Sequence, residues 1–216
     1  TAAEGLALVY AHKLFHVNVT KWSPNHVAGE SGTNGRPTAN YVRAAVTPVF
    51  NEWDLAVGTQ LWSGTAKRED PANPGAVADV ATKAWAVDAQ AQGKVGNLPL
   101  GVYFSHAVAK ATPAGGTPNL FNESEPNNKK ATAISAELGI IPNKATLMLA
   151  FLRGNTGEAT NSGDNALTLG GTYMIAQNVQ LQFLYTKRSG SRYDPANPNL
   201  PETGNKLMTL MLSAGF

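Results

Sequence analysis

Apolar and polar side chains alternate with a period of two along much of the chain, most regularly at its C-terminal end. Counting back from the last residue, every second side chain is apolar, whereas the positions between them include Gly215, Ser213 and Thr209. Successive side chains of a β-strand point to opposite faces, so the pattern predicts a strand from Leu207 to Phe216 with one apolar face. That face consists of Met208, Leu210, Leu212, Ala214 and Phe216.

The same period predicts further strands upstream, about ten in all. In the opening stretch, Leu6 to Trp22, the alternation slips around His12 and Lys13, which predicts one long strand with a β-bulge. Pro48 has no backbone N–H to donate and weakens the strand that contains it. The remaining predicted strands are Val42–Phe50, Leu55–Trp62, Trp85–Gln92, Leu100–Val108, Ile134–Ile140, Leu147–Phe151, Leu167–Ile175 and Val179–Thr186.

The connections between these strands fall into two length classes that alternate strictly along the chain. Links of roughly three to seven residues alternate with loops of roughly twelve to twenty, as in outer-membrane barrels. A soluble β-sandwich has no reason to sort its connections in this way. The pattern predicts one domain, residues 1–216, folded as an antiparallel up-and-down transmembrane β-barrel. The long loops are Ser23–Asn40, Lys67–Lys83, Ala111–Lys130, Gly154–Asn165 and Ser189–Asn205.

Composition agrees with a barrel and disfavours a membrane helix. Charged residues are 15% of the chain, against about 25% in average soluble proteins. The longest apolar runs, such as Leu147–Leu152, are far shorter than the roughly 20 residues that a membrane helix needs. The opening residues do not resemble a signal peptide. We therefore expect either that a signal was removed or that the chain is the C-terminal part of a larger barrel.

The end of the chain resembles the closing strand, or β-signal, of Gram-negative outer-membrane proteins. The resemblance rests on Met208, Leu210, Leu212, Ala214 and the terminal Phe216. It implies location in the bacterial outer membrane, contact with outer-membrane lipid, and recognition of this strand by the barrel-assembly machinery. Below that level the chain is best described as porin-like.

Polar side chains on the faces opposite the apolar ones are candidates to line a lumen. Their mixed charges would replace part of the hydration of a passing solute and give weak charge selectivity. The leading expectation is passive diffusion of small hydrophilic solutes or ions, and the alternative is an interior filled by its own side chains. The candidates are Arg43, Gln60, Asp88, Gln90, Gln92, Glu137, Gln180 and Gln182, to which Ser105, Arg153 and Arg188 can be added.

Little in the sequence favours catalysis, a cofactor or a metal ion. The chain has no cysteine, which removes thiolate ligands and covalent haem attachment. His12 and His16 are expected to share a face, but neither they nor His26 and His106 have an acidic partner nearby. An outer-membrane hydrolase is a weaker alternative, because Ser105 and His106 are adjacent and point to opposite faces. We expect no enzyme activity, no metal and no cofactor.

Partners other than lipid and solutes are less defined. The net charge of +2, without a long basic run, argues against nucleic acid. A second functional class is a structural barrel that sheathes a haem-containing protein of an electron conduit, and homo-oligomers are also open. The sequence Asp-Pro-Ala-Asn-Pro occurs at 70–74 and 194–198, and stiff turns explain it better than a cation site. Aromatic residues near strand ends are expected to form interface girdles, except Trp62, which falls on the lumen face.

Overall fold

The protein is a single large antiparallel sheet, seen here in a computed structural model that describes residues 2–26, 37–69, 76–198, 200–201 and 204–215. The sheet has twelve strands in the order β1-β2-β3-β5-β8-β9-β10-β11-β12-β13-β14, with β4 paired to β5 beside this path. The predicted up-and-down order is therefore confirmed. Its strands are β1 (Ala2–His12), β2 (Phe15–His26), β3 (Ala39–Val46), β4 (Val49–Phe50), β5 (Trp53–Ser63), β8 (Ala84–Val95), β9 (Leu98–Ala109), β10 (Lys129–Ile141), β11 (Ala145–Asn155), β12 (Gly163–Ala176), β13 (Val179–Ser189) and β14 (Lys206–Ala214).

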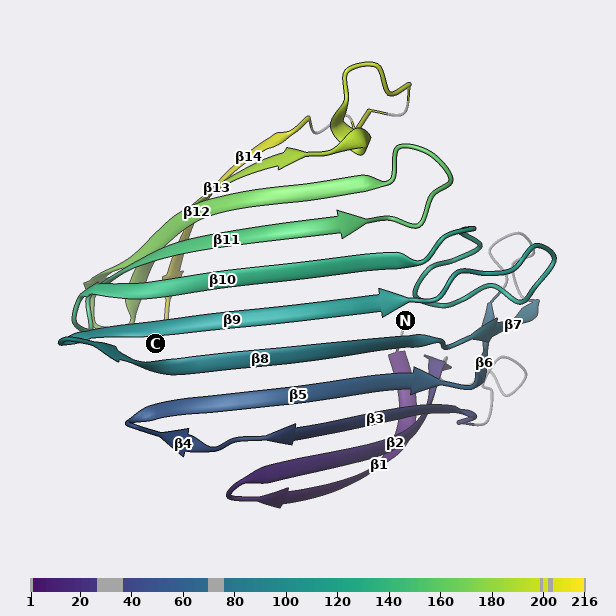
Figure 1. Cartoon of the computed structure of the whole chain (residues 1–216), viewed down its shortest axis with the longest axis horizontal. Coiled ribbons are helices and arrows are strands. Elements are labelled where there is room, and N and C mark those ends of the chain that lie inside the picture. Colours follow the sequence, from purple (N-terminus) through teal and green to yellow (C-terminus); the bar gives the residue numbers. More distant parts are fainter. Residues whose placement is uncertain (1, 27–36, 70–75, 199, 202–203, 216) are drawn as a thin grey trace.

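The sheet is strongly curved but is not closed. Both of its edges, β1–β2 and β13–β14, bend back behind the central strands in the view of Figure 1. Among the described residues, β1 pairs only with β2, and β14 pairs only with β13. Closure into a barrel, which the sequence predicted, is therefore not present between these two edges.

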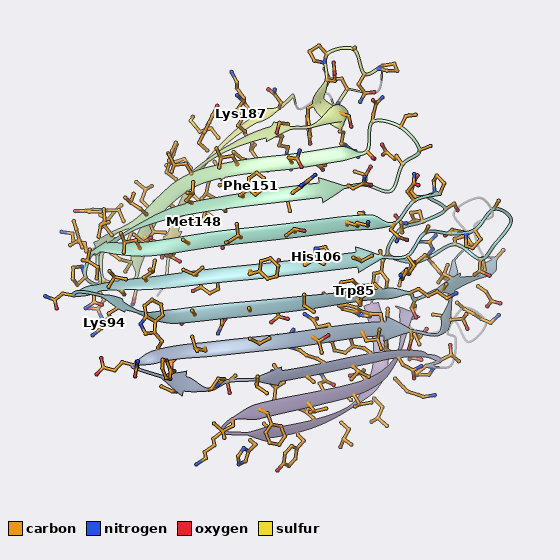
Figure 2. The ribbon with its side chains drawn as sticks, viewed as in Figure 1. Trp85, Lys94, His106, Met148, Phe151 and Lys187 are labelled. Atoms are coloured by element: carbon orange, nitrogen blue, oxygen red, sulfur yellow. The ribbon has the colours of Figure 1, made fainter. Side chains whose placement is uncertain are left out.

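The two faces of the sheet differ in chemistry as the alternation predicts. Cross-strand partners share a face, and the register aligns Ala89, Phe104, Ile134, Phe151 and Leu167 across five neighbouring strands. These side chains belong to the convex face, where Figure 2 shows Trp85, His106 and Phe151 projecting toward the viewer. No described segment of the chain covers this face, and Leu8 and Leu169 are 76% and 58% exposed.

The absence of a second layer appears in the total accessible surface, which is 13702 Å². A compact soluble monomer of this mass, 22.7 kDa, would expose about 9,500 Å². Apolar side chains that a sandwich would bury between two sheets are therefore left open on this molecule.

One end of the sheet, the short-turn end, carries the tight connections. Residues with positive φ make these reversals possible: Asn51 and Glu52 have φ values of 48° and 64°, and Asn143 and Asn178 have 56° and 61°. Asparagine tolerates the left-handed region better than most residues, and two consecutive left-handed residues suit a two-residue hairpin. The strand pairs predicted from their short links are confirmed.

The N-terminal stretch differs from its prediction. It is not one bulged strand but the hairpin of β1 and β2, with Lys13 and Leu14 between His12 and its partner Phe15. The apparent slip in the alternation is this reversal of the chain. Consequently His12 and His16 lie on opposite faces, because His16 pairs with Ala11 rather than following His12 along one strand.

Pro48 interrupts the next predicted strand, as expected. Strand β3 ends at Val46, and β4 resumes for Val49 and Phe50 only. The Pro48 carbonyl still accepts a hydrogen bond from the Leu55 backbone N–H at 2.9 Å. Proline therefore removes a donor and divides the strand without separating it from β5.

The other end, the long-loop end, is more structured than predicted. Strands β6 (Thr65–Glu69) and β7 (Val77–Ala81) form a separate hairpin within the stretch expected to be a loop. Against it lies the segment 110–128, which follows β9 and makes a parallel bridge between Asn119 and Ala81. Ala39, Ala66 and Val80 form a small buried core here, with Trp22 and Leu120 packed on it. A short 3-10 helix, η1 (Ser191–Tyr193), lies in the loop after β13.

The C-terminal strand is confirmed as β14, which pairs with β13 from Lys187↔Lys206 to Val179↔Ala214. Phe216 lies outside the described residues. Within the described part of the chain, no helix has the length and apolar character that crossing a membrane requires.

Candidate functional site

Three of the predicted lumen residues meet on the concave face in one hydrogen-bonded network. Arg43 on β3 forms a bidentate ion pair with Asp88 on β8, with nitrogen–oxygen distances of 2.9 and 3.1 Å. Gln60, on the intervening strand β5, donates from Nε2 to Asp88 Oδ2 at 3.3 Å. Tyr41 donates its hydroxyl to Gln60 Oε1 at 3.1 Å. The Arg43 and Asp88 side chains stay 28% and 30% exposed, so the network is open to solvent.

Gly58 makes room for this ion pair. The register places Gly58 opposite Asp88 on one side and opposite Ala45 on the other. A Cβ at Gly58 would lie 3.0 Å from Asp88 Oδ1 and 3.3 Å from the Ala45 Cβ. The missing side chain thus lets the Asp88 carboxylate lie over β5 and reach Arg43 two strands away.

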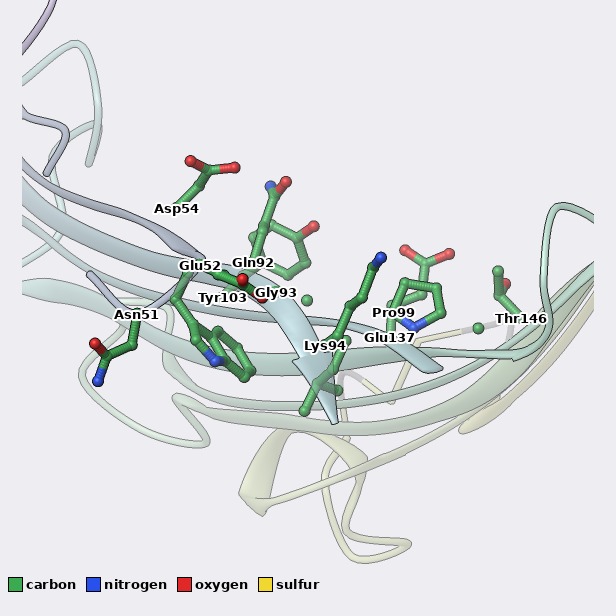
Figure 3. Close-up of a pocket in the computed structure, with 14 residues that line it drawn as sticks. Asn51, Glu52, Asp54, Gln92, Gly93, Lys94, Pro99, Tyr103, Glu137 and Thr146 are labelled. Atoms are coloured by element: carbon green, nitrogen blue, oxygen red, sulfur yellow. The ribbon is translucent and has the colours of Figure 1, made fainter. Parts of the chain in front are cut away.

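A second polar area, the groove at the short-turn end, contains two more predicted residues. Its cavity volume is about 540 Å³, and Gln92 and Glu137 are part of its wall. Figure 3 shows Asp54, Gln92 and Glu137 projecting to the same side of the curved sheet, together with Lys94. With Glu52 also on its wall, the groove holds three carboxylates and one ammonium group. It therefore favours cations.

The remaining predicted residues lie outside these two clusters, and all except Arg153 are on the concave face. Gln90 pairs with Ala56 and Tyr103. Gln180 and Gln182 lie on β13, separated from β8 by strands β9 to β12. Ser105 and Arg188 are also concave, whereas Arg153 is not: it pairs with Thr132 and Asn165 in the convex file of Phe151. Arg153 stands two residues after Phe151 on β11, so it shares the convex face of that side chain.

An aromatic cluster lies beside the network at the long-loop end. Phe121 in segment 110–128 contacts Trp62 and Trp22, with ring centroids 5.6 and 6.5 Å apart. Trp62 also contacts Tyr41 at 5.1 Å. The expectation that Trp62 lies on the lumen side is consistent with this arrangement. Trp22 and Tyr41 are among the aromatic residues near strand ends that were expected in interface girdles, but they belong to the same concave cluster instead.

Segment 110–128 is fixed in place by buried amides and one ion pair. Asn119 Nδ2 donates to the carbonyls of Lys83 and Lys110, at 2.9 and 2.7 Å. Arg68 donates two hydrogen bonds to the Glu123 carboxylate, at 3.2 and 3.0 Å. These bonds lower the pKa of the Glu123 carboxyl below its ordinary value. The segment, with the β6–β7 hairpin, forms a cap at this end of the sheet.

The concave face is not polar throughout, although the sequence predicted polar side chains there. Over β11 to β14 it carries an apolar patch, flanked by hydroxyl pairs such as Thr168 with Thr186 at 2.8 Å. Methionine and leucine side chains adapt to irregular apolar surfaces. The patch consists of Met148, Leu152, Leu184, Leu207 and Met211.

The histidines are dispersed. His106 lies on the convex face, with Nδ1 2.7 Å from Thr132 Oγ1 and its ring 5.3 Å from Trp85. Ser105, its neighbour in sequence, pairs with Asp88 on the concave face. His12 and His16 are on opposite faces, and the side chain of His26 lies outside the described residues. Among the described residues, no three acidic or histidine side chains come close enough to hold a metal ion.

Only the second copy of the repeated pentapeptide can be described. Asp194 Oδ1 accepts from the Ala196 backbone N–H at 2.9 Å, and the buried Asn197 accepts from Asn161 at 3.0 Å. The Asp194 oxygen thus closes the turn, as the interpretation of a stiff turn predicts, and the Asn197 oxygen links the turn to the loop between β11 and β12. The first copy lies outside the described residues.

Comparison with known proteins adds no family to this geometry. No protein-family model matches the chain. No curated protein matches it either.

Proposed function

We propose that this chain forms the wall of a bacterial outer-membrane β-barrel, porin-like in function, through which small hydrophilic solutes or ions diffuse passively. The observation that carries the proposal is the contrast between the two faces of one uncovered sheet. The convex face is apolar and open over nearly every strand, while the concave face holds the Arg43–Asp88 pair and the acidic groove.

A lipid environment accounts for the convex face. Apolar surface costs about 25 cal/mol per Å² when it stays in water, and no second layer of this molecule removes it. Strands that pair on both sides also satisfy their backbone groups, which the interior of a bilayer demands. Among the described long strands of the main sheet, the outer edges of β1 and β14 lack this pairing, and the short strand β4 pairs on one side only.

Closing the wall requires more than these strands. Without β4, eleven strands follow one another antiparallel from β1 to β14, so these two edge strands run in the same direction. Bacterial outer-membrane barrels are antiparallel and have an even number of strands. The proposed barrel therefore includes an odd number of further strands between β14 and β1.

The concave face supplies a suitable lining for hydrophilic solutes. Guanidinium, carboxylate, amide and phenol groups lie together at the network, and they offer both donors and acceptors to a partly dehydrated solute. Because Arg43 and Asp88 neutralise one another, the network selects weakly by charge. The groove, with its excess of carboxylates, would enrich cations at the short-turn end.

Planar-bilayer recording tests the proposal directly. The purified protein, shown to be folded by heat-modifiable migration on a denaturing gel and by β circular dichroism in detergent, should give ohmic single-channel steps. A folded protein that inserts but never conducts would refute the pore. A protein that is monomeric and soluble without detergent would refute the barrel as well.

A structural sheath is the second candidate, and the apolar concave patch favours it. Met148, Leu184 and Met211 would suit a protein surface inside the barrel better than they suit water. The partner expected from the sequence is a haem protein of an electron conduit. Haem absorbance that copurifies with the barrel, combined with absence of conductance, would favour this function over diffusion.

A further inference from the structure

Four cations mark the end of the apolar convex face on strands β10 to β14. Lys130, Arg153, Lys187 and Lys206 lie at the long-loop end, and we call them the basic belt. Arg153, Lys187 and Lys206 each extend a line of apolar side chains on the convex face of their own strand. Arg153 stands two residues after Phe151, Lys187 two residues after Tyr185, and Lys206 two residues before Met208. Lys130 pairs with Val108 of the same face. The belt therefore borders the apolar surface instead of lying among the loops.

Within the described residues, no carboxylate pairs with the belt. All four side chains are exposed, and none takes part in an ion pair within the described part of the chain. Lys187 and Lys206 are direct cross-strand partners. Like charges directly opposite one another destabilise a sheet, so an anion bound between these two side chains would offset their repulsion.

The opposite border of the same strands is different. At the short-turn end the convex side chains include Ile140, Ile175 and Val179, which carry no charge. The cation in this region, Lys144, lies over the Tyr173 ring, 5.3 Å from its centroid. Among the described residues of β10 to β14, the unpaired positive charge of the convex face thus lies at one border of the apolar surface.

We infer that the basic belt binds the phosphate groups of anionic lipid headgroups in the leaflet at the long-loop end. The inference rests on the proposed membrane location of the convex face. Long Lys and Arg side chains lie along apolar surface and place their charges at headgroup level. Lipid phosphates are the anions present at that level, and one phosphate between Lys187 and Lys206 relieves their repulsion. Arg153 adds a planar guanidinium that binds phosphate oxygens in pairs.

Lipid retention in native mass spectrometry tests the inference. The folded protein in neutral detergent is exposed to equal amounts of phosphatidylglycerol and phosphatidylcholine, and the bound lipids are counted. We expect a clear preference for phosphatidylglycerol. Lys187→Gln with Lys206→Gln should reduce that preference roughly 25-fold, because each juxtamembrane cation contributes roughly a fivefold effect and the two effects multiply. The Lys187→Arg, Lys206→Arg variant should retain it.

A matched control removes the same charge elsewhere. Lys13 and Lys144 are exposed at the short-turn end, outside the acidic groove, and changing both to Gln should leave the lipid preference unchanged. Equal losses in both double variants would overturn the belt as the binding site, and so would displacement of the lipid by inorganic phosphate. Absence of any preference in a protein that is heat-modifiable and conducts would refute this inference alone. Loss of folding in detergent would instead refute the proposed membrane location.

Discussion

At the scale of single residues, the Arg43–Asp88 pair combines exposure with a defined geometry. It spans three strands because Gly58 leaves the space between them open. Exposed ion pairs contribute little stability, typically below about 1 kcal/mol. The pair is therefore better explained by the charged groups that it places on the concave face than by its contribution to the stability of the fold.

Replacing Asp88 with Asn tests that interpretation. The variant keeps the shape of the side chain but leaves the Arg43 guanidinium without its carboxylate, so we expect ion selectivity to shift toward anions. The free energy of unfolding should fall by only about 1 kcal/mol. The reversal potential of single channels in a salt gradient measures the shift. Asp79→Asn is the control, because Asp79 pairs with Lys67 at 3.4 Å on the β6–β7 hairpin, outside the main sheet. The same shift in both variants would contradict the prediction.

The cap should respond to acid through Glu123. Its carboxyl pKa is lowered by the hydrogen bonds from Arg68, from an ordinary value of 4.5. With a lowered folded pKa, the stabilisation is complete above the ordinary value and is lost as the pH falls through the lowered one. We therefore expect faster hydrogen exchange at the Asn119 and Asn122 amides only in that acidic range, after correction for intrinsic rates.

The effect on the cap should be small, since the Glu123 side chain is 64% exposed and such pairs contribute under about 1 kcal/mol. In Arg68→Gln the acid-dependent step should disappear, and exchange should already be faster at neutral pH. An unchanged step in that variant would assign the acid response to another group.

At the scale of elements, periodicity predicted the strands because each lies between one apolar and one polar environment. Periodicity failed where a chain reversal, or contacts with a distant segment, determined the structure instead of the alternation. The β1–β2 reversal looked like a bulge because Lys13 and Leu14 carry no strong turn signal, unlike Asn51 or Asn178. The β6–β7 hairpin was invisible because it is stabilised by contacts with segment 110–128, far away in sequence.

Segment 110–128 depends on Phe121 for its contact with the sheet. Phe121→Ala removes the ring that meets Trp62 and Trp22, contacts worth about 0.5–1.5 kcal/mol per aromatic pair. We expect faster tryptic cleavage after Lys110 and a red shift of tryptophan emission, with β circular dichroism unchanged. Leu200→Ala, in the loop after β13, is the control and should change neither. If cleavage stays slow, the amide bonds of Asn119 hold the segment without Phe121.

At the scale of the whole molecule, the sequence predicted which residues share a face but not how they combine. Arg43, Gln60 and Asp88 were identified individually from their polar faces. Their meeting required the register between β3, β5 and β8, and no single strand contains that information. Tyr41 completes the network two residues before Arg43 on the same face, so the period of two could have found it. The apolar concave patch emerged only when β11 to β14 were aligned side by side.

The contrast between the two faces yields the most direct test of the architecture, because neighbouring residues on one strand should respond in opposite ways. Leu149 lies mid-strand on the convex face and is 52% exposed, while Ala150 pairs with Ser135 and Thr168 on the concave face. In a bilayer, Leu149→Lys places a charge among lipid chains and should cost about 2–4 kcal/mol. Ala150→Lys adds the same charge to the concave face, beside the hydroxyls of Ser135 and Thr168 and away from lipid, and should change the free energy of unfolding by less than about 1 kcal/mol. Urea unfolding from neutral phospholipid vesicles measures both. In water the two positions would be similarly hydrated, so two equally small effects would mean that lipid does not cover the convex face.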